Sequence, residues 1–228
     1  MPHGRPEREP EQPEREPEQP HQPRSFQPGE GWRVGDDGVP YRHAARVLLL
    51  DADDRLLLVR AHDADQVERT WWFTVGGGID PGETPEVAAV REVAEETGLV
   101  IDAGALVGPV ASRWALFDFF ARSVRQHEVF FVHRLPVTGT AAEELSTAGW
   151  TAVERSFVDE LGWWSLEQLR EIDGEVFPAR LPELLAHVLE NLPRAVGDTD
   201  RPDAGTVGTP GVWAPEVWDL TESGPARR

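Results

Sequence analysis

The sequence predicts an α+β fold in which helices cover a mixed β-sheet, as in an α/β/α sandwich. Three observations favour this class. Several hairpin-like β runs follow one another along the chain, capped helical segments alternate with them, and residues 41–193 form one segment of ordinary domain size. We therefore expect a single domain over residues 41–193, flanked by two tails.

The first strands are predicted by two apolar runs that a short polar stretch connects. The runs are Ala44–Leu50 (AARVLLL) and Leu56–Arg60 (LLLVR). Asp51, Asp53 and Asp54 lie between them, and aspartate favours turns. The pattern therefore predicts a β-hairpin.

Three further strands are predicted by runs that are rich in aromatic and β-branched residues. They are Trp71–Val75, Arg113–Phe120 and Glu128–His133. Residues of this kind favour the half-buried surface of a sheet. The first of these strands leads directly into three consecutive glycines.

Three helices are predicted from their capping residues and apolar stripes. Thr84 is a good N-cap and Gly98 suits the residue just after the end, so a helix is expected over residues 85–97. Ser165 with Gln168 three residues later forms a capping-box pattern that opens a second helix. A last helix is predicted by an apolar stripe of Leu181, Leu184, Leu185, Val188, Leu189 and Leu192.

Both ends of the chain are expected to be tails. Residues 1–40 are predicted to be disordered, because the heptapeptide PEREPEQ occurs twice there and has no large apolar side chain to bury. Residues 194–228 are predicted to be a flexible tail, because Gly197–Pro210 consists largely of Gly, Asp, Thr and Pro. Trp213 and Trp218 in this tail could dock on the body or on a partner.

Charge and composition exclude several classes of partner. The formal net charge is -19 and the sequence pI is near 4.7, which gives a field that repels nucleic acid phosphates and anionic lipid head groups. The chain has no cysteine, which fits a reducing compartment, and its apolar runs are too short to span a bilayer. We therefore expect a cytoplasmic protein that binds neither polymeric nucleic acid nor a membrane. A homodimer is compatible with the sequence.

Three glutamates crowd into five residues of the helix predicted over residues 85–97. They are Glu92, Glu95 and Glu96. Like charges at this spacing destabilise an isolated helix, so the pattern indicates a bound cation. Val87, Val90 and Ala94 fall near the opposite pole of the helix, so we expect these apolar residues to be buried and the carboxylates to face the glycine loop. Ligands that are all oxygen suit Mg²⁺, with Mn²⁺ as the alternative.

The stretch from Gly77 to Leu99 follows a spaced pattern of nine specified residues. They are Gly77, Glu83, Arg91, Glu92, Val93, Glu95, Glu96, Gly98 and Leu99. The pattern resembles the signature of the Nudix hydrolases, and the segment WWSLEQL at Trp163–Leu169 is similar to the late part of such domains. Val75 departs from the family, because many relatives carry proline before the glycines.

The resemblance implies a Nudix-type α/β/α sandwich that uses water and Mg²⁺ to cleave a nucleoside diphosphate linked to another group. A modified nucleoside triphosphate, a nucleotide sugar and ADP-ribose all remain open as the small-molecule substrate. The resemblance also implies metal ligation and an ion pair between Glu83 and Arg91 that holds the loop to the helix. The implied metal ligands are the Gly76 carbonyl, Glu92, Glu95 and Glu96. Either Glu92 or Glu95 is expected to take a proton from water as well.

Two residues outside the signature are further candidates for the site. Glu128 opens an aromatic strand, so it is either an exposed edge charge or a further metal ligand or catalytic base. Along that strand it shares a face with Phe130 and Val132, where a carboxylate is costly unless it meets a cation. Trp114 is a candidate for stacking on a nucleobase, although an aromatic residue is most often part of the core.

Two other classes of function compete with the enzyme. A nucleotide-sensing regulator would bind its ligand through a Nudix-like domain without cutting it, and an interaction module would use the repeat and the terminal tryptophans. The regulator would need a DNA-binding segment or an eroded signature, and the signature is intact. Metal-dependent turnover by residues 41–193 would separate the enzyme from both.

Deleting Met1–Gln27 is expected to leave turnover and melting temperature nearly unchanged. A segment almost without large apolar side chains can add little to a hydrophobic core. Thermal melting and metal-dependent hydrolysis of the full-length and shortened chains check this. A large fall in either quantity would mean that the repeat packs on the body.

Overall fold

The computed structural model describes six stretches of the chain, and all structural statements below concern these. They are residues 31–63, 66–119, 122–136, 145–152, 154–192 and 216–221. The strands are β1 (Arg33–Val34), β2 (Pro40–Leu50), β3 (Leu56–His62), β4 (Thr70–Gly78), β5 (Val107–Phe119), β6 (Arg122–Arg134), β7 (Val158–Trp164), β8 (Glu175–Phe177) and β9 (Trp218–Asp219). The helices are α1 (Pro85–Thr97), α2 (Leu166–Arg170) and α3 (Leu181–Asn191), with short 3-10 turns η1 (Ala103–Ala105) and η3 (Glu154–Ser156).

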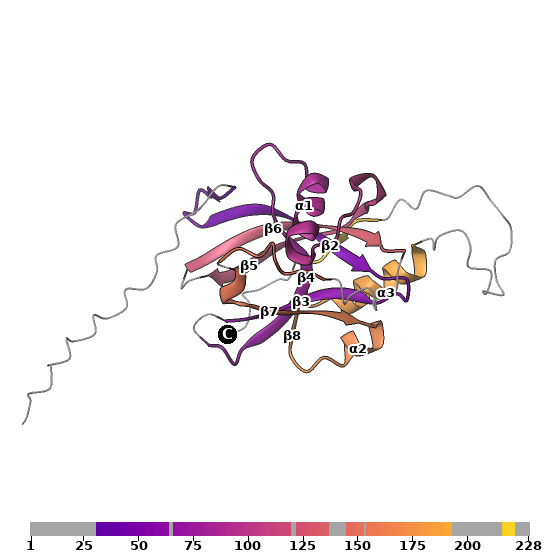
Figure 1. The fold of residues 1–228 in the computed structure, drawn as a ribbon. Helices are drawn as coiled ribbons and strands as arrows, with labels where there is room; N and C mark the ends of the chain where they lie inside the picture. The colour runs from indigo at the N-terminus through magenta and orange to yellow at the C-terminus, as the bar shows by residue number, and fades with distance from the viewer. Residues whose placement is uncertain are drawn as a thin grey trace, which may run out of the picture.

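The strands form one mixed sheet between helices (Figure 1). The strand order is β7-β3-β4-β2-β6-β5-β9, with β1 beside β2 and β8 beside β4. Three pairs are parallel, namely β2 with β6, β4 with β8 and β5 with β9, and the others are antiparallel. The predicted α+β class is confirmed. No helix in the described ranges is long and apolar enough to cross a membrane.

Two apolar clusters fill the two faces of the sheet. The first cluster packs α1, through Ala88, Ala89 and Val93, on the buried odd-numbered residues of β2. The second packs α2 and α3 on the opposite face, through Leu169 and the predicted leucine stripe of α3. Because side chains of a strand alternate between faces, each central strand contributes to both clusters.

The predicted helix boundaries are confirmed, because they depend on local capping. α1 spans the predicted residues, Thr84 Oγ1 accepts a hydrogen bond from the Val87 amide at 3.4 Å, and Gly98 ends the helix at φ 75°. In α2, the side chains of Ser165 and Gln168 form the predicted capping box. The N-termini of α1 and α2 therefore have side-chain partners for free backbone amides, whereas α3 begins without a side-chain cap.

The predicted hairpin of β2 and β3 forms only at its turn. Asp51 accepts hydrogen bonds from the amides of Asp53 and Arg55, as turn chemistry requires. The two strands then pair only at Leu50 and Leu56, because β4 lies between them for the rest of their length. A local turn thus fixes the connection but leaves the pairing to the sheet.

Parts of both predicted tails belong to the sheet. At the N-terminal end, β1 pairs with β2 through Arg33 and Val34, so ordered structure starts before residue 40. At the C-terminal end, β9 pairs with β5, so the prediction of a flexible tail from residue 194 is wrong for residues 216–221. Trp213 lies outside the described residues.

The segment 216–221 is held by side-chain contacts as well as by the pairing of β9 with β5. Trp218 stacks on His187 of α3 at 4.8 Å between ring centroids and lies below the guanidinium of Arg180 at 5.4 Å. Leu220 is 1% exposed and belongs to the cluster beneath α3. The sequence pointed to the tryptophan, but the leucine provides the buried anchor.

Leu220→Ala is expected to lower the free energy of unfolding by about 2–5 kcal/mol, the usual cost of emptying a buried leucine site. Val217→Ala is the matched control, because Val217 is 47% exposed in the same segment and its loss should cost less than about 0.5 kcal/mol. Urea unfolding of both variants checks this. Equal midpoints would contradict the docking of this segment.

Candidate active site

The site is built where β4 ends in three glycines and the chain turns into α1. A Cβ atom at Gly77 would lie 2.6 Å from the carboxylate of Glu92, so a side chain there would displace this carboxylate. Gly76 has φ +125°, and a Cβ there would lie 2.2 Å from the Ala45 carbonyl oxygen. The glycines therefore leave the end of β4 without side chains. The carboxylates of α1 occupy the space beside this end, which we call the glycine edge.

The buried face of α1 differs from the predicted one. Glu92 and Glu96 are each only 8% exposed and lie on the same side of the helix as the alanines that contact the sheet. Val87 is 49% exposed, and Val90 and Ala94 are only half-buried, so the prediction that these three residues form the buried face is wrong. The physical reason is the glycine edge, since a helix can turn carboxylates toward a sheet only where the strand carries no side chains.

Burial disfavours the charge of both carboxylates. Glu96 Oε2 accepts a hydrogen bond of 2.8 Å from the Gly76 amide. Even so, burial and the nearby Glu92 raise the pKa of Glu96 to about 8. Burial also raises the pKa of Glu92. Two carboxylates in this position need a cation to be ionised together.

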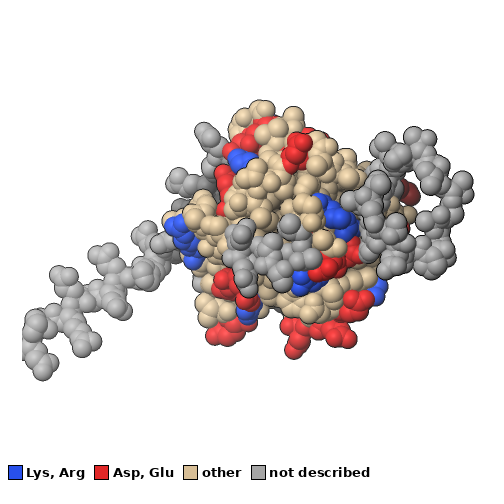
Figure 2. Space-filling model, turned by 45° about the vertical axis from the view of Figure 1, so that its right-hand side comes forward, with Lys and Arg blue, Asp and Glu red and all other residues tan. Residues whose placement is uncertain are grey.

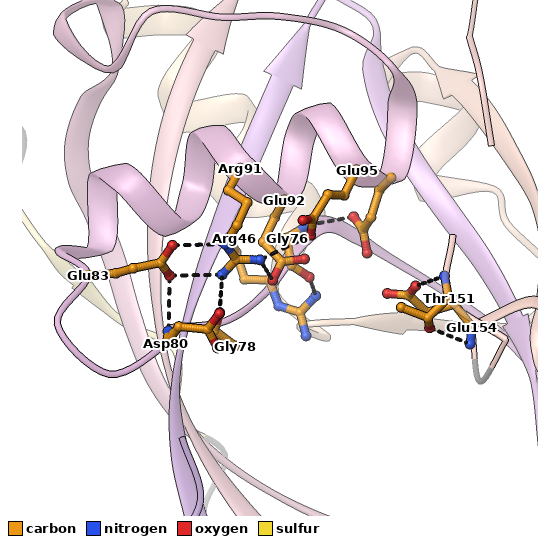
Figure 3. A network of polar contacts seen from close by, with 11 residues as sticks. Arg46, Gly76, Gly78, Asp80, Glu83, Arg91, Glu92, Glu95, Thr151 and Glu154 are labelled. Carbon is orange, nitrogen blue, oxygen red and sulfur yellow. Dashed lines mark hydrogen bonds and ion pairs between the residues drawn. The ribbon is translucent and has the colours of Figure 1, made fainter. Parts of the chain in front are cut away.

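Arg91 connects the loop before α1 to the glutamates (Figure 3). Its Nε and Nη2 donate to the two oxygens of Glu83, each at 2.9 Å, and Nη2 also donates to the Gly78 carbonyl at 2.8 Å. This is the predicted ion pair, and it lowers the pKa of Glu83. Nη1 additionally reaches Glu92 at 2.8 Å and Glu95 at 3.1 Å. The Glu95 side chain is 52% exposed, so it lies at the outer rim of the site.

Arg46 on β2 is the first functional candidate that the sequence did not reveal. Its Nη1 donates to the carbonyl oxygens of Gly76 and Thr74, and its Nε pairs with Glu128 at 2.9 Å. Figure 3 shows the guanidinium below Glu92 and Gly76. The arginine is therefore the cation that contacts the carbonyl predicted to bind a metal. A charged residue within the apolar run AARVLLL was the available signal.

Glu128 is buried rather than an exposed edge charge, so that alternative is wrong. The residue is 2% exposed. Arg46 and Arg113 donate to its two oxygens, and Gln126 Nε2 donates at 2.7 Å. These cations lower the pKa of Glu128 to about 2 against the effect of burial. The charge that a carboxylate on this face requires is supplied by arginines.

Arg42 completes a polar cluster on this face of the sheet. Its Nε donates to Gln126 Oε1 at 2.6 Å, and its guanidinium lies 4.9 Å from the centre of the Trp32 ring. Burial and the neighbouring Arg46 lower the pKa of Arg42 to about 10. Like Arg46, it was not identified from the sequence.

A loop at residues 145–152 braces the end of α1 that carries the glutamates. Trp150 Nε1 donates to the Glu96 carbonyl at 2.9 Å, and the Ser146 amide donates to the Thr97 carbonyl at 2.8 Å. A Cβ at Gly149 would lie 2.3 Å from the Glu95 carbonyl oxygen. The close approach fixes the last turn of the helix, where a shift would displace the carboxylates.

Trp114 lies outside the core, on the same sheet face as a histidine pair. The indole is 44% exposed and lies 4.8 Å from the ring of His127, whose Nδ1 is 3.3 Å from Nδ1 of His43. Both histidines line a cavity of about 560 Å³ that also contacts the loop at residues 79–83. This cavity therefore extends from the two histidines beside Trp114 to the loop that carries Glu83.

The residues at the glycine edge offer the kind of ligand atom that a hard divalent cation prefers. The Gly76 carbonyl, Glu92, Glu95 and Glu96 offer only oxygen, and burial raises the pKa of Glu92 and Glu96, an effect that a bound cation would oppose. Within the described ranges, no three acidic or histidine side chains converge into a finished metal site. Arg46 donates to the Gly76 carbonyl and Arg91 to Glu92 and Glu95, so these oxygens already face positive charge.

Comparisons with known proteins identify the family. The profile of the NUDIX domain matches residues 40–185, which is more than half of the 228 residues. An RNA pyrophosphohydrolase of Sphingopyxis alaskensis is 39% identical over 66 residues, which are 29% of this chain and 40% of that protein. One of Gluconobacter oxydans is 42% identical over 60 residues, which are 26% of this chain and 34% of that protein.

The matched segments thus span well under half of these curated relatives. Among solved structures, the E. coli dihydroneopterin triphosphate pyrophosphohydrolase is 18% identical, with 65% of this chain and 95% of that one covered at a TM-score of 0.48. The family match covers the whole sheet core, α1 and the glycine edge. The chain belongs to the Nudix family.

Proposed function

We propose that this protein is a Mg²⁺-dependent pyrophosphohydrolase that cleaves the phosphoanhydride of a nucleoside diphosphate linked to another group. The observation that carries the proposal is the pair of buried carboxylates, Glu92 and Glu96, at a strand edge that glycines keep open. Burying two like charges is unfavourable unless a cation binds there. A structural role alone gives no reason for this arrangement.

The proposed metal ligands are Glu92, Glu95, Glu96 and the Gly76 carbonyl, with Mn²⁺ as an alternative ion. A divalent cation bound there neutralises phosphate oxygens and makes water a better nucleophile. Arg91 and Glu83 hold the loop against the helix. Trp150 and the Gly76 amide keep Glu96 in place through hydrogen bonds at its carbonyl and carboxylate.

Among the candidate bases, the contacts favour Glu92 over Glu128, with Glu95 as the alternative. Both oxygens of Glu128 are engaged by arginine, and a carboxylate with a pKa of about 2 is a weak proton acceptor at neutral pH. Among the described residues, Glu92 accepts a side-chain hydrogen bond from Arg91 alone, and it lies against Gly77. We therefore propose that Glu128 positions Arg46 and Arg113, while Glu92 takes the proton.

The substrate we propose is a small nucleotide. The cavity beside His43 and His127 has about 560 Å³, a size suited to a nucleoside, and the exposed indole of Trp114 at its side supports stacking on a base.

The relatives named RNA pyrophosphohydrolase act on RNA by name. The net charge of -19 disfavours a long polyanion. On the face in Figure 2, the described basic side chains are separated by acidic and uncharged ones. A cytoplasmic location agrees with such a substrate.

The proposal is tested by incubating the protein with a panel of nucleotides and Mg²⁺ and identifying the products by mass. The panel contains modified nucleoside triphosphates, nucleotide sugars and ADP-ribose, with EDTA as the control. Turnover that EDTA abolishes supports the enzyme. Binding without turnover for every member would support the nucleotide-sensing regulator instead.

Glu95→Gln and Glu96→Gln are each expected to weaken Mg²⁺ binding and to lower turnover by roughly a hundredfold or more, because each removes a charge that faces the cation. Glu96→Gln should leave the metal-free protein at least as stable as the parent, since an amide replaces a buried carboxylate with a raised pKa. Calorimetric Mg²⁺ titration, kinetics and thermal melting check these results. Near-normal activity in both variants would overturn the ligand assignment.

Glu128→Gln and Glu92→Gln are expected to differ in stability, although both lower kcat. Loss of the Glu128 charge leaves Arg46 and Arg113 buried without a counter-ion, which should cost about 3–5 kcal/mol. Glu92→Gln should cost little, because burial already disfavours its charge. Denaturant unfolding of the two variants measures the contrast. A stable Glu128→Gln variant would show that the arginines do not depend on this carboxylate.

A further inference from the structure

The outer edge of β5 is covered by residues 216–221. β9 in this segment pairs in parallel with Ala111 and Ser112 of β5, and the Leu220 amide then donates to the Ser112 carbonyl at 2.8 Å. The profile of the NUDIX domain matches residues 40–185, so this strand comes from a part of the chain beyond the match. An edge strand presents unpaired backbone groups to solvent, and the segment provides partners for some of those on β5.

One hydrogen bond of this segment reaches a residue of the proposed substrate site. Thr221 Oγ1 accepts a hydrogen bond of 3.0 Å from the backbone amide of Trp114. The Thr221 amide in turn donates to Asp219 Oδ1 at 2.9 Å, which fixes the residue that carries this hydroxyl. Trp114 lies opposite His127 where β5 pairs with β6, so its backbone has a neighbouring strand on the inner side and Thr221 on the outer side.

The indole of Trp114 borders the hollow part of this sheet face. It lines a cavity of about 380 Å³ together with Tyr41 and Arg125. Its ring centroid also lies 6.2 Å from that of His43 and 4.8 Å from that of His127, and both histidines line the cavity of about 560 Å³. The position of this indole therefore affects the shape of both cavities.

The segment is anchored on the opposite face of the sheet. Leu220 is 1% exposed in the cluster beneath α3, and Arg180 at the start of α3 donates through Nη1 to the Asp219 carbonyl at 3.4 Å. The indole of Trp114 lies on the α1 face, because it shares a row across the strands with His43, an odd-numbered residue of β2. The segment therefore joins a fixed point beneath α3 to the strand residue that carries the indole.

Protection of the sheet edge alone does not account for Thr221. Pairing with β5 and burial of Leu220 explain why the segment docks, whereas the bond between Thr221 and Trp114 is exposed and adds little to stability. Water would also satisfy an exposed amide, but water exchanges and leaves a strand edge free to move. A hydroxyl that is fixed by Asp219 gives the amide a partner in a defined position. The contact therefore holds Trp114 in place more than it stabilises the fold.

We propose that Thr221 is a positioning residue of the substrate site. By holding the backbone of Trp114 at the outer edge of β5, it fixes the indole as the wall on which the base of a nucleotide stacks. A wall that is already fixed loses less freedom when the ligand binds, so the affinity is higher. The stacking rests on the proposed function, whereas the position of the indole does not.

The first test observes the indole directly, by nuclear magnetic resonance of the tryptophan side-chain N–H groups in the full chain. Trp114→Phe removes one signal and thereby assigns it. Thr221→Val keeps the side-chain volume and loses the acceptor, so we expect it to shift the Trp114 signal and to leave the melting temperature close to that of the parent. Thr221→Ser keeps the hydroxyl and should keep the signal. Val217→Ala is the control, because it changes an exposed residue of the same segment.

The second test uses AMP as the probe for nucleotide binding, followed at the same signal. Thr221→Val should weaken AMP binding about threefold to tenfold, the range for the net loss of one hydrogen bond. Thr221→Ser and Val217→Ala should bind AMP like the parent. With Mg²⁺ and a substrate found with the nucleotide panel, Thr221→Val should raise KM by a similar factor and leave kcat unchanged, because its printed bonds are to Trp114 and Asp219 rather than to a proposed metal ligand.

The outcomes separate this inference from the proposed function. An unchanged Trp114 signal or parent-like AMP affinity in Thr221→Val, an equal loss in Thr221→Ser or Val217→Ala, or a parent protein that does not bind AMP would overturn the inference. Weaker AMP binding in Thr221→Val without turnover of any panel member would support the positioning role and contradict the enzyme. Turnover with an unchanged KM in Thr221→Val would support the enzyme and contradict the positioning role.

Discussion

The close approach of α1 to a strand edge without side chains is the constraint on which the site depends. Gly77 makes room for the Glu92 carboxylate, and the Gly76 amide binds Glu96. The Thr84 cap, the Glu83–Arg91 pair and the Trp150 hydrogen bond all fix the helix in this position. A side chain at Gly77 would displace the Glu92 carboxylate from the place that it occupies beside β4.

The second constraint is the balance of charge on the two sides of this edge. Buried carboxylates lie on the α1 side and buried arginines lie on the other, and the Gly76 peptide contacts both, through its amide to Glu96 and its carbonyl to Arg46. Each group is unfavourable in isolation, because burial disfavours charge of either sign. Together they place opposite charges on the two sides of the Gly76 backbone.

Local signals could be predicted from the sequence, and non-local ones could not. The bounds of α1 follow from Thr84, Gly98 and the residues between them, so they were predicted correctly. The buried side of α1 was predicted wrongly, because apolar periodicity assumes that a helix packs on side chains, and Gly77 has none. Arg46 was missed since its partners, Gly76 and Glu128, are distant in sequence. Likewise, the position of β4 between β2 and β3 depends on pairing among strands that are distant in sequence, which a turn signal does not report.

The position of Glu128 illustrates how a correct physical expectation can lead to the wrong partner. A carboxylate on an apolar strand face does need a cation, and the nearest cation inferable from the sequence was a metal at the glycine loop. The structure supplies Arg46 and Arg113 instead, and they bind both carboxylate oxygens. A carboxylate that holds two guanidiniums cannot readily accept a proton as well, because protonation would remove the negative charge that pairs with both. Its contribution to the site is therefore geometric: it fixes where the arginines point, and through Arg46 it influences the Gly76 carbonyl.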